Sequence, residues 1–142
     1  MYGKQTECAI AVMSRLAEVY DKGRTRLSAN DLADARGLQR PRVAKCLASL
    51  SQAGLVSGAP GPGGGFALAD HPRRIFLRNV FDLFERYRDH EICPFGGGKC
   101  GVGISCPLHD RLASVHKATN EFLDRTSFEV FRAAYQENGW RP

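Results

Sequence analysis

Two short helical patterns separated by a tight turn constrain the fold of this chain more than any other feature. The first begins at Ser28, where Asp31 stands three residues on, as in a capping box that satisfies free amides at a helix start. It ends at Gly37, which suits a left-handed helix stop. Pro41 fits the first position of the second helix, because its missing amide costs nothing there, and Gly54 ends that helix. Two such helices joined by a tight turn predict a helix-turn-helix.

The second of these helices has an apolar side and a basic side. The expected inward residues are Val43, Leu47 and Leu50, with Cys46 and Ala53 at the margin. Its other side carries Arg40, Arg42 and Lys45, and Gln39 stands just before it. Arginine suits guanine edges in the major groove and glutamine suits adenine, although contact with phosphate is at least as common per residue. We expect these four polar residues to face double-stranded DNA.

Basic residues are concentrated around this motif. The whole chain has a net charge of +5, from 20 Lys and Arg against 15 Asp and Glu. Between Lys22 and Lys45 there are seven basic and two acidic residues. A local positive excess attracts nucleic acid, because neutralised phosphates release condensed counterions. A charge run is more often a solvated face, so the excess supports DNA binding only together with the helix pattern.

A run of glycine and proline follows the motif. Short apolar segments at 55–57 and 66–69 flank it, and its own sequence over 58–65 is GAPGPGGG. Two short strands joined by such a turn are typical of a wing. The run lacks the Lys-Ser/Thr ending of a phosphate-binding loop, which argues against a nucleotide site. We predict wing contacts to DNA at Gly63 and Gly64.

The rest of the chain has helical patterns. Apolar residues at three-and-four spacing predict helices over 6–20 and 75–87. From Pro107 to about Leu123 a similar seam predicts a long helix that could pair with a copy of itself. The seam residues are Leu108, Leu112, Val115, Thr119 and Phe122. Thr126 and Glu129 predict a second capping box that opens the last helix.

These patterns predict a mainly α fold with a small β wing, in which a winged helix-turn-helix is joined to a long C-terminal dimerisation helix. We divide the chain into a DNA-binding domain at 1–87, a cysteine loop at 88–106, and a dimerisation helix with a C-terminal helix at 107–142. No stretch approaches the roughly 18 apolar residues of a membrane span, and no signal-peptide core is found. We therefore expect a cytoplasmic protein without a membrane partner.

The chain has five cysteines, an odd number. A reducing cytosol argues against disulfides and turns attention to metal or redox chemistry. Cys93, Cys100 and Cys106 fall within fourteen residues on a glycine-rich loop. Soft thiolates bind iron–sulfur clusters or zinc, and the six- and five-residue gaps match structural zinc knuckles poorly. Cys8 and Cys46 stand among apolar neighbours and are interpreted as core, although Cys8, beside Glu7, has a ligand role as its alternative.

The wing and the cysteine triplet together make a specific signature. The shared features are the N-terminal helix, the helix-turn-helix, Gly54-Leu55-Val56, the wing from Gly61 to Phe66, the cysteine loop and the helix start Thr126-Ser127-Phe128-Glu129. In these the chain resembles the Rrf2/BadM family of winged-helix regulators over nearly its whole length. The resemblance implies a homodimer paired through the long helix, with each winged unit on one half of a pseudo-palindromic site. It also implies that the three cysteines hold an iron–sulfur cluster, of the 2Fe-2S or the 4Fe-4S type.

Members of the family differ in the fourth ligand, and two residues here qualify. His109, three residues after Cys106, stands where some members have a histidine ligand, and a solvent-facing residue is its alternative. Glu7 matches a carboxylate that other members take from the partner subunit, and its alternative is a first-turn residue favoured by the helix dipole. Many members also have an arginine just before the wing glycines, where this chain has Pro60. That arginine is available for the minor groove of DNA. Arg73 and Arg74, after the second wing strand, could contact the DNA backbone in its place, or they could be a solvated pair.

The predicted function is a DNA-binding transcription regulator whose operator affinity is controlled by the cluster, in response to iron, redox state or nitric oxide. One alternative keeps the fold but uses thiol oxidation or a protein partner as the signal. Another, an electron carrier or cluster-delivery protein, needs the cysteine loop but gives no reason for the wing and the basic helix. We expect no enzyme, because neither a nucleophile–base pair nor paired carboxylates are found.

Overall fold

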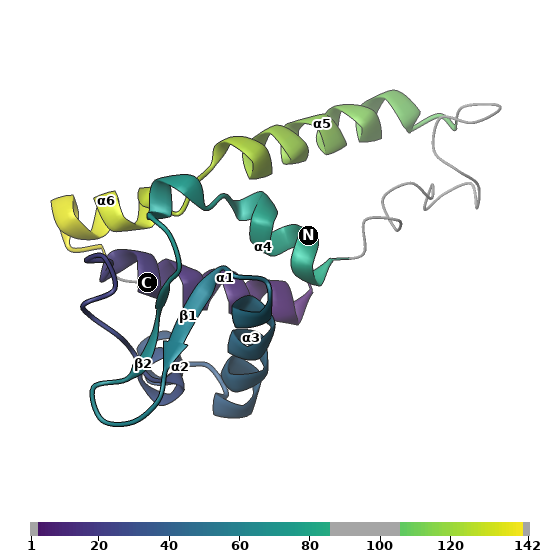
Figure 1. Cartoon of the computed structure of the whole chain (residues 1–142). Coiled ribbons are helices and arrows are strands. Elements are labelled where there is room, and N and C mark those ends of the chain that lie inside the picture. The colour runs from purple at the N-terminus through teal and green to yellow at the C-terminus, as the bar shows by residue number, and fades with distance from the viewer. Residues whose placement is uncertain (1–2, 86–105, 141–142) are drawn as a thin grey trace.

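The computed structural model describes residues 3–85 and 106–140 (Figure 1). The elements are α1 (Lys4–Glu18), α2 (Ala29–Arg36), α3 (Arg40–Gln52), β1 (Val56–Ala59), β2 (Gly65–Leu68), the 3-10 turn η1 (Pro72–Arg74), α4 (Leu77–Phe84), α5 (His109–Arg125) and α6 (Glu129–Asn138). Strands β1 and β2 form a two-stranded antiparallel sheet. The expected mainly α fold with a small β wing is confirmed. Within the described ranges no helix is long and apolar enough to cross a membrane.

The helix-turn-helix forms as its sequence signals predict. The Ser28 hydroxyl accepts a hydrogen bond from the Asp31 amide, and the Asp31 carboxylate accepts one from the Ser28 amide, each at 3.0 Å. Gly37 ends α2 with a φ of 61°. Helix α3 begins at Arg40, so Pro41 takes its second position rather than the first. The change costs nothing, because the second amide of a helix has no intrahelical acceptor either.

Helix α1 lies at the centre of the molecule and packs against α2, α3, α4 and α6. Its buried Val12, Met13 and Leu16 join one apolar core. Other members of that core are Leu32, Val43, Leu47, Leu50, Val80, Leu123 and Phe128. Figure 1 shows α6 lying along α1, although the two are far apart in the sequence. The C-terminal helix therefore helps to cover the core of the winged helix-turn-helix.

The wing strands pair from Val56 with Leu68 to Ala59 with Gly65. A third segment, which the sequence patterns did not predict, adds to their edge. Leu27 and Phe66 exchange two backbone hydrogen bonds, at 3.0 and 2.7 Å. The wing is thus joined by backbone pairing to the segment just before α2.

Further expectations at the level of single residues are wrong. Ala53, expected at the margin of the inward side of α3, is exposed, because it follows the last turn of that helix. Leu83, an apolar residue of the helix expected over 75–87, is exposed on α4. Helix α4 begins at Leu77, because residues 72–74 form a 3-10 turn before it.

The capping box expected at Thr126 and Glu129 also does not form. Thr126 is the C-cap of α5, and α6 begins at Glu129 with Phe128 as its N-cap and no side-chain cap bond. The Glu129 carboxylate lies instead 3.7 Å from Arg73 and 3.5 Å from Arg132. The Thr126 carbonyl accepts a hydrogen bond from the Leu77 amide at 2.9 Å, and Glu129 is the first residue of α6 rather than its third.

Candidate nucleic-acid interface and cysteine site

Helix α3 presents its polar residues on one exposed face. Gln39, Arg40, Arg42 and Lys45 are all exposed, whereas the opposite face of the helix is buried. Arg40 has a partner, since its guanidinium lies 3.5 Å from the Asp34 carboxylate, and both side chains are exposed. An exposed ion pair is worth at most about 1 kcal/mol, so Arg40 can exchange this partner for a phosphate. The four residues predicted to face DNA therefore lie together and are accessible.

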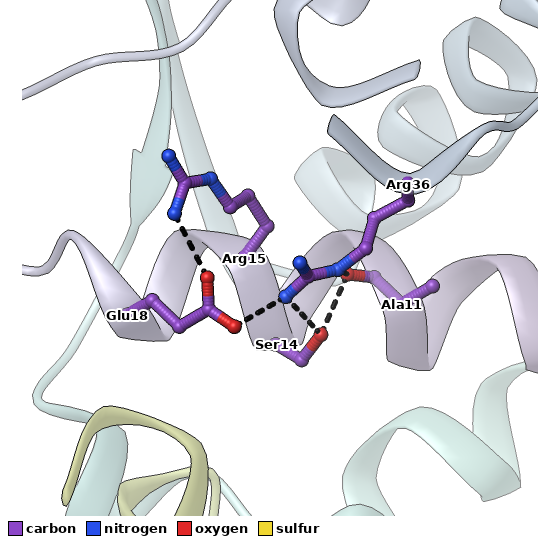
Figure 2. A network of polar contacts seen from close by, with 5 residues as sticks. All are labelled: Ala11, Ser14, Arg15, Glu18 and Arg36. Atoms are coloured by element: carbon purple, nitrogen blue, oxygen red, sulfur yellow. Dashed lines mark hydrogen bonds and ion pairs between the residues drawn. The ribbon is translucent and has the colours of Figure 1, made fainter. Parts of the chain in front are cut away.

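The turn before α3 is held by a buried polar network, shown in Figure 2. Arg36, in the last turn of α2, donates to the Glu18 carboxylate at 2.5 Å, to the Ser14 hydroxyl at 3.0 Å and to the Ala11 carbonyl at 3.3 Å. Glu18 also accepts from Arg15 at 2.9 Å. Sequence reasoning did not find this network. A possible signal was a charged residue, Glu18, directly after the apolar positions of α1.

The network extends to the C-terminal helix. The Arg15 guanidinium lies 5.6 Å from the centre of the Tyr135 ring on α6. A cation at this distance from an aromatic face is attracted by the ring. Through Glu18 and Arg15 the helix-turn-helix is thus connected with α6.

The wing is supported by a side chain from outside it. Arg26 donates to the carbonyl of Ser57, at 3.2 Å, and to that of Gly65, at 3.5 Å, so it contacts both strands. Gly64 has no room for a side chain, since an added Cβ would lie 2.2 Å from the Ala59 carbonyl oxygen. Gly63 is exposed at the turn. Both predicted wing glycines therefore lie in the turn that connects β1 to β2.

The segment before α2 is also fixed by hydrogen bonds. Asp21 accepts from the hydroxyl of Thr25 at 2.6 Å and from its amide at 2.7 Å. These hydrogen bonds, the hydroxyl first, lower the pKa of the Asp21 carboxyl.

Arg73 and Arg74, considered above as contacts to the DNA backbone, are exposed but paired. Arg74 lies 2.5 Å from the Asp70 carboxylate, and Arg73 lies 3.7 Å from that of Glu129. Either pair would have to open before the arginine could bind a phosphate.

The candidate metal ligands fall partly within the described residues. Cys93 and Cys100 lie outside them. Cys106 is half-buried just before α5, and the amide of His109 donates to its carbonyl at 3.0 Å. Glu7 is exposed in the first turn of α1, 3.6 Å from the Lys4 ammonium. Over residues 3–85 and 106–140 no three metal-binding side chains form a group. Within one chain, Cys106 and His109 are joined by this backbone hydrogen bond, and Glu7 forms no metal-binding group with them among the described residues.

Cys8 and Cys46 are buried in the core, as predicted. Burial raises the pKa of the Cys46 thiol to about 12, and its hydrogen-bonded contact with Cys8 acts in the same direction. Burial also raises the pKa of the Cys8 thiol. A buried, protonated thiol is a poor nucleophile and a poor metal ligand.

The start of α1 is hydrogen-bonded to Glu85, which lies three residues before the cysteine loop at 88–106. The Glu85 carboxylate accepts from the Gly3 amide at 2.7 Å and from the Thr6 hydroxyl at 2.6 Å. A carboxylate is favoured here by the partial positive charge of a helix N-terminus. Glu7 therefore directly follows Thr6, whose hydroxyl binds Glu85 shortly before the cysteine loop.

Helix α5 has an apolar seam that the single chain leaves uncovered. Val115 is 57% exposed and Phe122 is 49% exposed, and Leu108 is exposed beside the N-terminal end of the helix. Three apolar side chains in contact with water along one helix are an unusual feature unless a partner covers them.

Comparison of the chain with known proteins agrees with this geometry. A sequence profile of the Rrf2 family, described as an iron-dependent transcriptional regulator, matches residues 2–133. The HTH-type regulator BadM of Rhodopseudomonas palustris is 35% identical over 82 residues, which are 58% of this chain and 51% of that protein. This chain thus spans about half of BadM. IscR of Xenorhabdus nematophila is 28% identical over 99 residues, 70% of this chain and 60% of that protein.

Two solved structures have the same fold. IscR of T. potens superposes with a TM-score of 0.74 at 21% identity, over 100% of this chain and 93% of that one. CymR of B. subtilis, the global cysteine regulator, superposes with a TM-score of 0.72 at 21% identity, over 94% of this chain and 96% of that one. The relatives are transcription regulators and not enzymes. Because the family profile covers most of its length, this chain belongs to the Rrf2 family of transcription regulators.

Proposed function

We propose that this chain is a homodimeric, DNA-binding regulator whose affinity for its operators is set by an iron–sulfur cluster. The observation that carries the proposal is the single exposed face of α3, where Gln39, Arg40, Arg42 and Lys45 lie beside the wing formed by β1 and β2. This face has the shape and charge that a major groove accepts. Each good bidentate pair with a base edge adds about 1–3 kcal/mol of discrimination.

The dimer is proposed on the apolar seam of α5. Leu108, Val115 and Phe122 would leave water by packing against the same residues of a second copy. Self-pairing along a two-fold axis needs one self-complementary patch, which a helix seam supplies. Two winged units held in this way would bind two half-sites about one turn of DNA apart.

The cluster is proposed on the chemistry of the donor set. Cys93, Cys100 and Cys106 would hold it with either His109 or Glu7, and thiolate, imidazole and carboxylate are all iron ligands. Cys106 and His109 are three residues apart and only half-buried, while Cys8 and Cys46 are buried and protonated. The residues of this chain therefore fit such a group. A bound cluster would supply iron chemistry that responds to oxygen, nitric oxide or iron supply.

The position of Cys106 supports a route from this site to DNA. Cys106 lies three residues before the start of α5 at His109, so a constraint on its side chain acts close to the helix that we propose as the dimer contact. At the other end of the loop, Glu85 contacts the first turn of α1. Both ends of the cysteine loop thus lead to elements on which the spacing of the α3 helices depends.

A regulator of the same fold without a cluster is the second candidate. The likeness to CymR, a cysteine regulator, favours it, because that protein shows the fold serving a different signal. The loop thiols would then be oxidised, or a partner protein would bind. An electron carrier leaves the wing and the exposed basic face without a role.

The test compares the wild-type protein with Cys100→Ala and Cys46→Ala after anaerobic reconstitution with iron and sulfide. We expect visible absorption bands, iron and acid-labile sulfide in the wild type and in Cys46→Ala, and their loss in Cys100→Ala. A colourless wild type that still binds its selected operator would favour the candidate without a cluster. Full iron and sulfide in Cys100→Ala would overturn the ligand assignment.

A further inference from the structure

Arg78 joins α4 to the C-terminal half of α5. Its Nε donates to the Asp124 carboxylate at 2.7 Å, and its Nη2 donates to the Asn120 side-chain carbonyl at 2.8 Å. Asp82, one turn along α4, lies 3.4 Å from Nη1, and the guanidinium lies 5.8 Å from the centre of the Phe81 ring. The Arg78 side chain is only 15% exposed. Arg78 is therefore a planar donor held between two helices with its direction fixed.

The side-chain hydrogen bonds described between α4 and α5 lie in the C-terminal half of α5. Leu123 is its only buried residue, and Figure 1 shows the helix extending away from α2 and α3. A backbone bond from the Leu77 amide to the Thr126 carbonyl, at 2.9 Å, fixes the point where α5 ends. This one backbone bond does not by itself fix the angle of α5. Asn120 and Asp124 lie one turn apart on one side of α5, so two bonds from Arg78 fix its angle as well.

A small change in the angle of α5 produces a large displacement of the N-terminal end of this helix. Seventeen residues make a helix about 25 Å long at 1.5 Å per residue. A tilt of about 10° at the C-terminal end therefore moves the N-terminal end by about 4 Å. One base pair occupies about 3.4 Å along B-DNA, so this displacement is equivalent to about one base pair.

We propose that Arg78 is a positioning residue that sets the half-site spacing this regulator accepts. The inference rests on the proposed function, because it needs a dimer paired through α5. Arg78 acts on the direction of α5, and the angle of α5 sets the separation of the two α3 helices. DNA itself is bound by α3 and the wing.

The experiment begins with the wild-type operator, obtained by selection from random DNA. Affinity is then measured on operators lengthened or shortened by one and two base pairs between the half-sites, and on a single half-site. We expect the wild type to lose about tenfold or more for each wrong spacing, the scale of one mismatched position. In Arg78→Ala the affinities for the wild-type spacing and for spacings changed by one base pair should lie within about threefold of each other, with half-site affinity unchanged.

Two further variants separate positioning from a general structural role. Asn120→Ala combined with Asp124→Ala removes both acceptors from an exposed helix surface and should flatten the spacing profile in the same way. Arg78→Lys keeps the charge but cannot span two acceptors, so we expect an intermediate profile. Asp82→Ala, which removes the contact within α4 but keeps both bonds from Arg78 to α5, should keep the sharp wild-type profile.

The outcomes are distinguishable. A wild-type spacing profile in both Arg78→Ala and the double variant would overturn the inference and leave the proposed function standing. A half-site loss as large as the full-site loss would show that Arg78 only stabilises the fold. A wild-type protein that sediments as a monomer on its operator would overturn the proposed dimer together with the inference.

Discussion

The Arg36 guanidinium donates to the Glu18 carboxylate across 2.5 Å, between side chains that are 7% and 1% exposed. Glu18 stands at the end of α1 and Arg36 at the end of α2, directly before the turn that leads to α3 (Figure 2). A buried ion pair thus helps to fix the end of α2, directly before the turn to α3. Such pairs add little net stability over apolar residues, but removal of one partner leaves a buried charge uncompensated.

Glu18→Gln should destabilise the protein by about 3–5 kcal/mol, because Arg36 stays buried without its counter-charge. The free energy of unfolding, measured by urea denaturation, checks this. Asp34→Ala is the matched control, since it opens the exposed pair with Arg40 and should cost no more than about 1 kcal/mol. Equal losses in the two variants would contradict the role of the buried pair.

Gly64→Ala should separate the wing strands, because the added Cβ would lie 2.2 Å from the Ala59 carbonyl oxygen. The expected loss of stability is about 1–3 kcal/mol, the cost of a strained local backbone. Hydrogen exchange gives the sharper readout, since the Phe66 amide, bonded to Leu27, should lose protection while α1 keeps it. Pro62→Ala, at the exposed turn, is the control, and equal exchange at Phe66 in both variants would refute the steric argument.

The elements that sequence patterns predicted well are those with local causes. The capping box at Ser28, the left-handed Gly37 and the apolar face of α3 each depend on residues within one or two helical turns, and all three form. The expected capping box at Thr126 did not form, because residues 126–128 pair with residues 75–77 through backbone hydrogen bonds and α6 begins only at Glu129. Local signals are reliable until tertiary backbone pairing moves the start of the helix.

Several of the contacts that sequence reasoning missed are long-range. Arg26 looked like part of a basic run, but it donates to wing carbonyls more than thirty positions away. Arg78 was only a polar residue of an expected helix, although it contacts Asn120 and Asp124. No periodicity within one element encodes these partners. The exposed side of α3, by contrast, followed directly from which of its residues are apolar.

Alkaline pH should destabilise the wild type more than Cys46→Ala. The folded-state pKa of the Cys46 thiol is raised to about 12 from an ordinary value of 9.0, so its stabilising effect is full below 9 and is lost as pH rises towards 12. Unfolding free energies of the two cluster-free proteins between pH 8 and 11 check this. We expect the difference between them to narrow as pH rises, and parallel curves would contradict burial as the cause.

Arg42→Ala should weaken binding to the selected operator by about 1–3 kcal/mol if Arg42 contacts a base edge. Affinity for random DNA should change little, because base contacts are absent there. Titrations on both DNAs at one salt concentration make the comparison. An equal loss on the two would make Arg42 a phosphate contact, and the salt dependence of binding would then fall as well.

The two candidates for the fourth ligand differ in how a signal would reach DNA. His109 is one helical turn from Cys106, so a cluster held with His109 would constrain one chain's loop and the start of its α5. Glu7 does not group with Cys106 and His109 within the described residues of one chain. A cluster held with Glu7 would therefore link the loop of one subunit to α1 of the other.

We predict that His109→Ala changes the visible spectrum of the cluster and speeds its decay in oxygen, whereas Glu7→Ala leaves both as in the wild type. The reason is proximity: His109 and Cys106 are already neighbours, while Glu7 has an exposed ion pair with Lys4 and needs a second subunit to come near the cysteines. Spectra and decay rates of the two reconstituted variants, with Lys4→Ala as the control for loss of that ion pair, decide between them. A decay rate changed only in Glu7→Ala would move the sensor to the subunit boundary, where loss of the cluster would act directly on the spacing of the two α3 helices.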